Sequence, residues 1–75
     1  MEVRLKLMGI LRAKTPDGGK LELPETATVE DVFQTLDIDP THVNLVTVNS
    51  EHVRDHSRAL SDGDEVMLLP PVGGG

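Results

Sequence analysis

The feature that most constrains the fold is a single helical segment near the middle of the sequence, with strand-like segments on both sides. Four apolar residues in it recur at the spacing of one helix face: Val29, Val32, Phe33 and Leu36. The segment starts at Thr28, a residue type that favours helix N-termini, and Pro40 ends it. A lone amphipathic helix must bury its apolar stripe against another layer, so we expect it to lie on a sheet.

Strand-like segments account for most of the remaining sequence. Apolar and charged residues alternate over residues 2–7, and again over 20–23 after the turn-forming residues 15–19. Further strands are expected at 43–48, 51–53 and 65–69, with that at 43–48 covered on both faces. This order predicts an α+β fold, a four- to five-stranded mixed sheet with one main helix across one face. The expected partners of the helix are Val3, Leu5 and Leu7.

The composition excludes several function classes. The 75 residues include no cysteine, so disulfides, thiolate metal sites and a cysteine nucleophile are excluded. Phe33 is the single aromatic residue and the net charge is −6, which argues against binding nucleic acid or an anionic membrane. No apolar run approaches the roughly 20 residues needed to cross a bilayer, and no signal peptide is evident. We therefore expect a cytoplasmic protein that is a monomer when alone.

The last six residues differ from the rest of the sequence. We expect residues 1–69 to form one domain and residues 70–75 a flexible C-terminal glycine tail. Prolines stiffen the base of such a tail, and glycines let it enter a channel too narrow for side chains. The only reactive group it delivers is the α-carboxylate of Gly75, which becomes an acyl donor after activation, for example as an acyl-adenylate. A disordered end without function is the alternative.

Two apolar residues of the last strand are candidates for partner docking. If Val66 and Leu68 face the helix, Met67 and Leu69 face the opposite side of the sheet and form an apolar patch beside the tail. The reverse register would place Met67 and Leu69 in the core. The run is apolar throughout, so the sequence leaves both registers open.

The histidines do not predict a metal site. His52 and His56 have the i, i+4 spacing of a helical ligand pair, but no helical stripe lies between them, and His42 completes no known ligand spacing. We interpret all three as solvated. No catalytic set is evident either, so we expect a protein that is not an enzyme and binds no cofactor itself.

The C-terminal part of the chain resembles a known family. Residues 62–66 (DGDEV) and 68–75 (LLPPVGGG) resemble the C-terminal signature of the ubiquitin-like sulfur carriers. That family includes the molybdopterin synthase small subunit and the thiamine-biosynthesis sulfur carrier. The helix start after residues 21–24 and the strand and turn at 46–49 are also similar, as are the length and element order of the whole chain.

The resemblance implies a β-grasp (ubiquitin-like) fold and a function that depends on partners. A ubiquitin-activating-type adenylyltransferase would use Mg-ATP to adenylate Gly75, and sulfur would displace AMP to leave a thiocarboxylate. A second partner, molybdopterin synthase large subunit or thiazole synthase, would consume the sulfur. The prolines followed by a valine favour molybdopterin over thiamine thiazole. The residues expected to thread into the partner site are Pro70, Pro71, Val72, Gly73 and Gly74.

Two other functions stay open at this point. The chain could be a ubiquitin-like protein modifier, conjugated to lysines through the same C-terminal glycine. It could also be a binding module with an inert tail.

Overall fold

The computed structural model describes residues 1–71, and its elements follow the predicted order. The strands are β1 (Glu2–Leu7), β2 (Lys20–Glu22), β3 (Leu45–Val48), β4 (Glu51–His52) and β5 (Glu65–Leu69). In this part of the chain one α-helix, α1 (Val29–Leu36), is present. Three short 3-10 helices complete it: η1 (Gly9–Lys14), η2 (Asp17–Gly19) and η3 (Pro40–His42).

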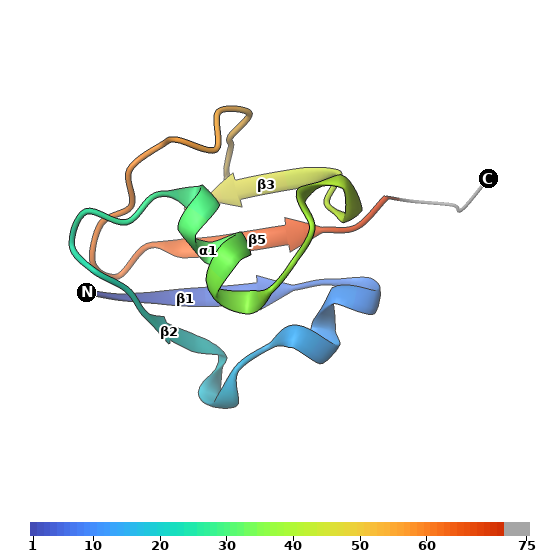
Figure 1. Ribbon diagram of the computed structural model, residues 1–75, viewed down its shortest axis with the longest axis horizontal. Coiled ribbons are helices and arrows are strands. Elements are labelled where there is room, and N and C mark those ends of the chain that lie inside the picture. Colours follow the sequence, from blue (N-terminus) through green and yellow to red (C-terminus); the bar gives the residue numbers. More distant parts are fainter. Residues whose placement is uncertain (72–75) are drawn as a thin grey trace.

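The strands form one five-stranded mixed sheet in the order β2-β1-β5-β3-β4. β1 and β5 pair in parallel at its centre, and the other pairs are antiparallel. Strands from the two ends of the sequence therefore lie side by side, with helix α1 across them (Figure 1). Because β1 and β5 are parallel, their C-terminal ends lie at the same end of the sheet.

Helix α1 begins as the sequence predicts but ends at Leu36, before Pro40. Asp31 closes a capping box at its start: the carboxylate accepts hydrogen bonds from the Thr28 backbone N–H at 2.7 Å and from the Thr28 hydroxyl at 3.2 Å. At its end, Asp37 adopts the left-handed conformation with a φ of 56°. The Nζ of Lys14 donates a hydrogen bond to the Asp37 carbonyl at 3.0 Å.

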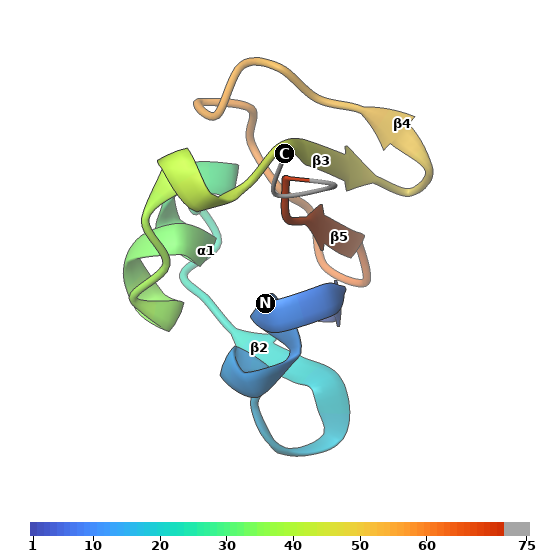
Figure 2. The ribbon, with the colours of Figure 1, turned by 90° about the vertical axis from the view of Figure 1, so that its right-hand side faces the viewer.

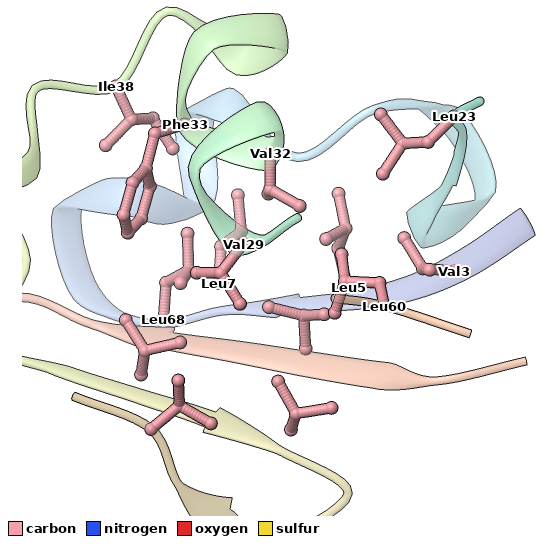
Figure 3. Packing of buried hydrophobic residues seen from close by; sticks show 14 of the residues in the cluster. Val3, Leu5, Leu7, Leu23, Val29, Val32, Phe33, Ile38, Leu60 and Leu68 are labelled. Atoms are coloured by element: carbon pink, nitrogen blue, oxygen red, sulfur yellow. The ribbon is translucent and has the colours of Figure 1, made fainter. Parts of the chain in front are cut away.

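The core lies between α1 and the sheet. The helix side chains Val29, Val32 and Phe33 point towards side chains of β1 and β5 (Figure 3). All three expected β1 partners are buried, as is Leu68 on β5, while Leu36 packs at the edge of this cluster. Among residues 1–71, no polar or charged residue is buried.

Strand β3 differs from the prediction in two ways. It begins at Leu45 rather than at residue 43, because the preceding residues turn through η3 and the Val43 N–H donates to the Pro40 carbonyl at 3.1 Å. It is also not covered on both faces: Val46 and Val48 are buried, but Leu45 and Thr47 are only partly buried.

Helix α1 covers one face of the sheet and leaves the other without a helix (Figure 2). We call this other face the outer face. From residue 1 to residue 71, no helix has the length and apolar character that a membrane crossing needs.

Candidate functional site

The candidate site lies where β5 ends and the predicted tail begins. β5 is held on both sides up to its last residue. The Leu68 carbonyl accepts a hydrogen bond from the Met8 N–H at 3.0 Å, and the Leu69 carbonyl accepts one from the Asn44 N–H at 2.8 Å. The chain is therefore fixed in position directly before Pro70.

Pro70 and Pro71 carry the chain away from the sheet. Neither has a backbone N–H, so neither can continue the ladder of hydrogen bonds. Pro70 is partly buried and Pro71 is exposed. The other residues of the predicted site, Val72, Gly73, Gly74 and Gly75, lie outside the described residues.

An apolar groove borders this exit from the sheet, and we call it the exit groove. Its residues come from three places in the sequence: the end of β1 with the start of η1, the end of η3, and the end of β5. They are Met8, Gly9, Ile10, His42, Leu69, Pro70 and Pro71. Leu69 and both prolines were predicted from the sequence, whereas the remaining four were not.

Ile10 is the exposed residue that the sequence analysis missed. Its exposed fraction is 80%, and it is the one large apolar residue in the described chain with such exposure. Gly9 ends the alternation of the first strand directly before Ile10. An apolar residue just after such a break was the available indication that its side chain is exposed. The neighbouring Leu11 is buried, so of these two adjacent apolar residues one lies in the core and one in solvent.

The register of the sheet decides how Met67 and Leu69 lie. Val66 and Leu68 are fully buried under α1, so the alternate residues of β5 lie on the outer face. Met67 is opposite Lys6 on β1 and Thr47 on β3, and Leu69 is opposite Leu45. Both are partly buried. Leu69 borders the exit groove, whereas Met67 lies one pleat away from it along β5.

The three histidines lie in different surroundings. His42 is exposed in the exit groove and His52 is exposed on β4. His56 differs from the prediction that it is solvated: it is partly buried, with its ring edge-to-face against Phe33 at a centroid distance of 4.8 Å. In the part of the chain described, no three His, Asp or Glu side chains come together as a metal site would require.

Asp39 holds the turn that presents His42 to the exit groove. Its Oδ1 accepts hydrogen bonds from the Thr41 backbone N–H at 2.9 Å and from the Thr41 hydroxyl at 2.8 Å. Both bonds favour the ionised carboxylate, the backbone one most, so the pKa of Asp39 lies below its usual value of 3.8. Asp39 is therefore the N-terminal cap of η3.

The arrangement is suited to presenting a chain end rather than to catalysis. It consists of an anchored strand end, two prolines and an apolar border, with one exposed imidazole and no paired acid and base.

Comparisons with known proteins agree with this description. The sequence matches the ThiS family over residues 5–75. A comparison with curated proteins finds no match.

Three solved structures are similar to this one. A Pyrococcus furiosus protein assigned as molybdopterin converting factor subunit 1 is 26% identical, with a TM-score of 0.74, over 96% of this chain and 99% of its own. Small archaeal modifier protein 1 from Haloferax volcanii is 25% identical, with a TM-score of 0.71, over 95% and 98%. A Helicobacter pylori complex of molybdopterin-converting factor subunits 1 and 2 contains a chain that is 20% identical, with a TM-score of 0.62, over 100% of both, and shows the β-grasp fold alone.

Proposed function

The chain belongs to the ThiS family, and from this premise we propose that it carries sulfur as a thiocarboxylate on the α-carboxyl group of Gly75. As a small ubiquitin-like member of that family it is not an enzyme. The observation that carries the proposal is that the family match extends through the glycines to residue 75. In this proposal residues 1–69 form a cytoplasmic, monomeric domain that carries the tail, and partner enzymes perform the chemistry.

The proposed chemistry has two steps on a partner enzyme. The Gly75 carboxylate attacks the α-phosphorus of Mg-ATP on a ubiquitin-activating-type adenylyltransferase, and pyrophosphate leaves. Sulfide then attacks the acyl carbon of the adenylate and AMP leaves, which produces the thiocarboxylate. If a protein persulfide attacks instead, the product is an acyl disulfide, and a second thiol must reduce it to release the thiocarboxylate. The chain needs no cysteine because the sulfur is held on a backbone carboxyl group.

The site residues have separate roles in this proposal. Pro70, Pro71, Val72, Gly73 and Gly74 thread into the partner, and the absence of side chains on the glycines admits them to a narrow channel. Met67 and Leu69 contact the partner surface around its entrance. The exposed Ile10 enlarges this apolar contact, because it borders the same exit groove as Leu69.

We favour molybdopterin biosynthesis over thiamine thiazole formation. Support comes from the Pyrococcus protein, which is 26% identical and assigned as a molybdopterin converting factor subunit. The Helicobacter complex, in which subunit 1 is joined to subunit 2, supports a second partner that accepts the sulfur. That partner would be the molybdopterin synthase large subunit.

Intact-mass spectrometry tests the carrier function. The purified chain is incubated with Mg-ATP, sulfide and a ubiquitin-activating-type adenylyltransferase from the same genome. We expect a mass increase equal to the exchange of one oxygen for one sulfur, located at Gly75 by fragmentation. Omission of ATP and deletion of Gly75 are the controls, and both should abolish the change. No mass change with any such adenylyltransferase of the genome would contradict the proposal.

The pathway is tested with the thiocarboxylated chain itself. We expect it to return to its original mass when mixed with molybdopterin synthase large subunit and the pterin precursor. Loss of sulfur only to thiazole synthase and its substrates would assign the chain to thiamine biosynthesis instead.

Protein modification is a second candidate, favoured by the 25% identity to small archaeal modifier protein 1. In that case the activated carboxyl group of Gly75 passes to lysine amines. Trypsin cleaves this chain last at Arg58, which would leave a remnant of residues 59–75 on a modified lysine. A Val72→Arg variant shortens the remnant to three glycines, which peptide sequencing detects readily. This function would be removed if the three-glycine remnant is absent from cells with the variant and the remnant of residues 59–75 is absent from cells with the wild-type chain.

A further inference from the structure

We propose that Gly9 is a positioning residue for the tail, because its lack of a side chain lets the Pro70 ring pack against the start of η1. This contact sets the direction in which the chain leaves the sheet. The inference rests on the proposed function, since direction matters only if a partner must receive the chain end.

The contact leaves no room for a side chain. Gly9 has a φ of +56°, and a Cβ added there would lie 2.8 Å from Cγ and 3.6 Å from Cδ of Pro70. Cβ atoms in proteins essentially never approach another heavy atom within 3.0 Å. Any residue other than glycine at this position therefore requires Pro70 or η1 to move.

Pro70 has little freedom to move apart from its backbone. Its ring closes on its own backbone nitrogen, so only a change of ring pucker moves Cγ relative to the backbone, and a larger displacement carries the backbone along. The residues before it are held by the hydrogen bonds from the Met8 N–H to the Leu68 carbonyl and from the Asn44 N–H to the Leu69 carbonyl. A displacement of Pro70 therefore moves Pro71, whereas the residues of β5 keep their positions.

The other side of the contact is also held. The Met8 carbonyl accepts a hydrogen bond from the Leu11 N–H at 3.1 Å, and the Leu11 side chain is buried. Gly9 thus lies between the end of the β1 ladder and the first turn of η1. We therefore expect a side chain at position 9 to displace Pro70 and Pro71 rather than this turn.

Two other glycines provide matched controls. Gly18 and Gly63 have φ values of +74° and +85°, but an added Cβ would meet nothing within 4 Å at either position. Gly18→Ala and Gly63→Ala therefore introduce the backbone strain of a positive φ alone. Gly9→Ala introduces the same kind of strain together with the collision with Pro70.

Adenylation kinetics test the inference. With Mg-ATP and an adenylyltransferase that accepts the wild-type chain, we expect Gly9→Ala to lower kcat/KM for the chain by about tenfold or more, since a displacement of ~1 Å can cost about 100-fold. The KM for ATP should not change. Gly18→Ala and Gly63→Ala should stay near wild type, although thermal unfolding should show strain in all three variants. An equal effect of the three variants on kcat/KM would overturn the inference.

A double-mutant cycle separates the contact from general destabilisation. Pro70→Ala removes Cγ and Cδ, so Gly9→Ala should have a much smaller effect on kcat/KM in that background than in the wild type. Additive effects would overturn the inference. If Gly9→Ala alone does not fold, the folded double variant is compared with Pro70→Ala, and a large remaining loss of kcat/KM would contradict the proposed contact.

NMR tests the contact without a partner. In the wild-type chain we expect a nuclear Overhauser effect between the Gly9 α-protons and the Pro70 γ-protons. Gly9→Ala should shift the amide resonances that follow Pro71, and the two control variants should leave them in place. Absence of the Overhauser effect or of these shifts would overturn the inference, even if adenylation occurs. Failure of the wild-type chain to be adenylated, with the NMR result as expected, would instead contradict the proposed function.

Discussion

At the scale of single residues, two exposed aspartates stabilise loops by binding the chain two residues ahead. Asp39 binds Thr41, and Asp55 binds Ser57 through the hydroxyl at 2.6 Å and the backbone N–H at 2.9 Å. Such local bonds replace the backbone partners that a loop lacks. The hydroxyl bond most of all, and then the backbone bond, hold the pKa of Asp55 below its usual value of 3.8.

Ser57→Ala should raise the pKa of Asp55 towards 3.8, because the larger of its two stabilising bonds is lost. Thr41→Ala should raise the pKa of Asp39 and leave Asp55 unchanged, so each variant is the control for the other. NMR titration of the side-chain carboxyl carbons measures both groups. An unchanged Asp55 titration in Ser57→Ala would show that the hydroxyl bond does not form in solution.

The same bonds predict the sign of an acid effect on stability. A carboxyl group with a lowered pKa in the folded chain adds stability that is complete above its unfolded value of 3.8. This stability is lost as the pH falls through the lower folded pKa. Ser57→Ala should therefore make the free energy of unfolding less sensitive to pH below about 3.8, measured by denaturant unfolding.

At the scale of elements, the side chains of β5 have different surroundings on the two faces of the sheet. Val66 and Leu68 face α1 and are fully buried, whereas Met67 and Leu69 lie partly buried on the outer face. A strand with period two can therefore hold the core together and present an apolar surface at once. Because residues 66–69 are all apolar, the sequence alone does not show which of them face the core.

Leu68→Glu and Leu69→Glu form a matched pair for this division. Leu68→Glu buries a charge without a partner and should unfold the chain, since domains of this size have only ~3–5 kcal/mol of stability. Leu69→Glu should keep the thermal unfolding transition and weaken binding to the adenylyltransferase or the sulfur acceptor. Circular dichroism and titration calorimetry measure the two effects. Unfolding by Leu69→Glu would mean that this residue belongs to the core.

Helix η1 connects the exit of the tail with the end of α1. It starts at Gly9, beside Pro70, and ends at Lys14, whose Nζ donates to the Asp37 carbonyl at the C-terminus of α1. The last turn of α1 has no basic residue of its own, and a cation there stabilises the helix dipole. One short element thus extends from Pro70 to the C-terminal end of α1.

At the scale of the whole molecule, α1 buries one face of the five-stranded sheet and leaves the other without a covering layer. Among the described residues there is no second α-helix to cover the outer face. A small domain has too little sequence for a third layer. In the proposed function the outer face and the exit of the tail both contact partners.

Deletion of Gly74 and Gly75 should abolish adenylation without lowering the thermal unfolding temperature. The buried core of the described chain ends at Leu68, so removal of the last two residues takes nothing from it. Addition of one residue after Gly75 should have the same two effects, because the reactive carboxylate is displaced. A marked fall in the unfolding temperature would show that the tail packs on the domain.

Sequence reasoning predicted the local features of the fold well. The alternation of residues 2–7, the helical stripe on Val29, Val32 and Phe33 and the turn at Asn49 all correspond to observed elements. Each is a periodicity or a turn preference that acts within a few residues. The start of β3 was wrong by two residues, because Asp39 and Thr41 close a turn that the apolar run at 43–48 concealed.

The surroundings of the tail were less predictable. Its prolines are evident in the sequence, but the exit groove joins Met8, Ile10 and His42 to Pro70, and these residues are far apart along the chain. Sheet pairing alone brings them together. The close approach of Gly9 to Pro70 has no local signal either.

The sequence by itself determined the order of the strands and the helix along the chain, because these elements depend on residues close to one another. Only the tertiary structure decided the order of the strands, the outward face of Met67 and Leu69, and the contact of Gly9 with Pro70. The physical reason is that an apolar strand has no fixed facing until it pairs. The parallel pairing of β1 with β5 decides which side chains of β5 face α1. The same pairing places the turn after β1 against the base of the tail.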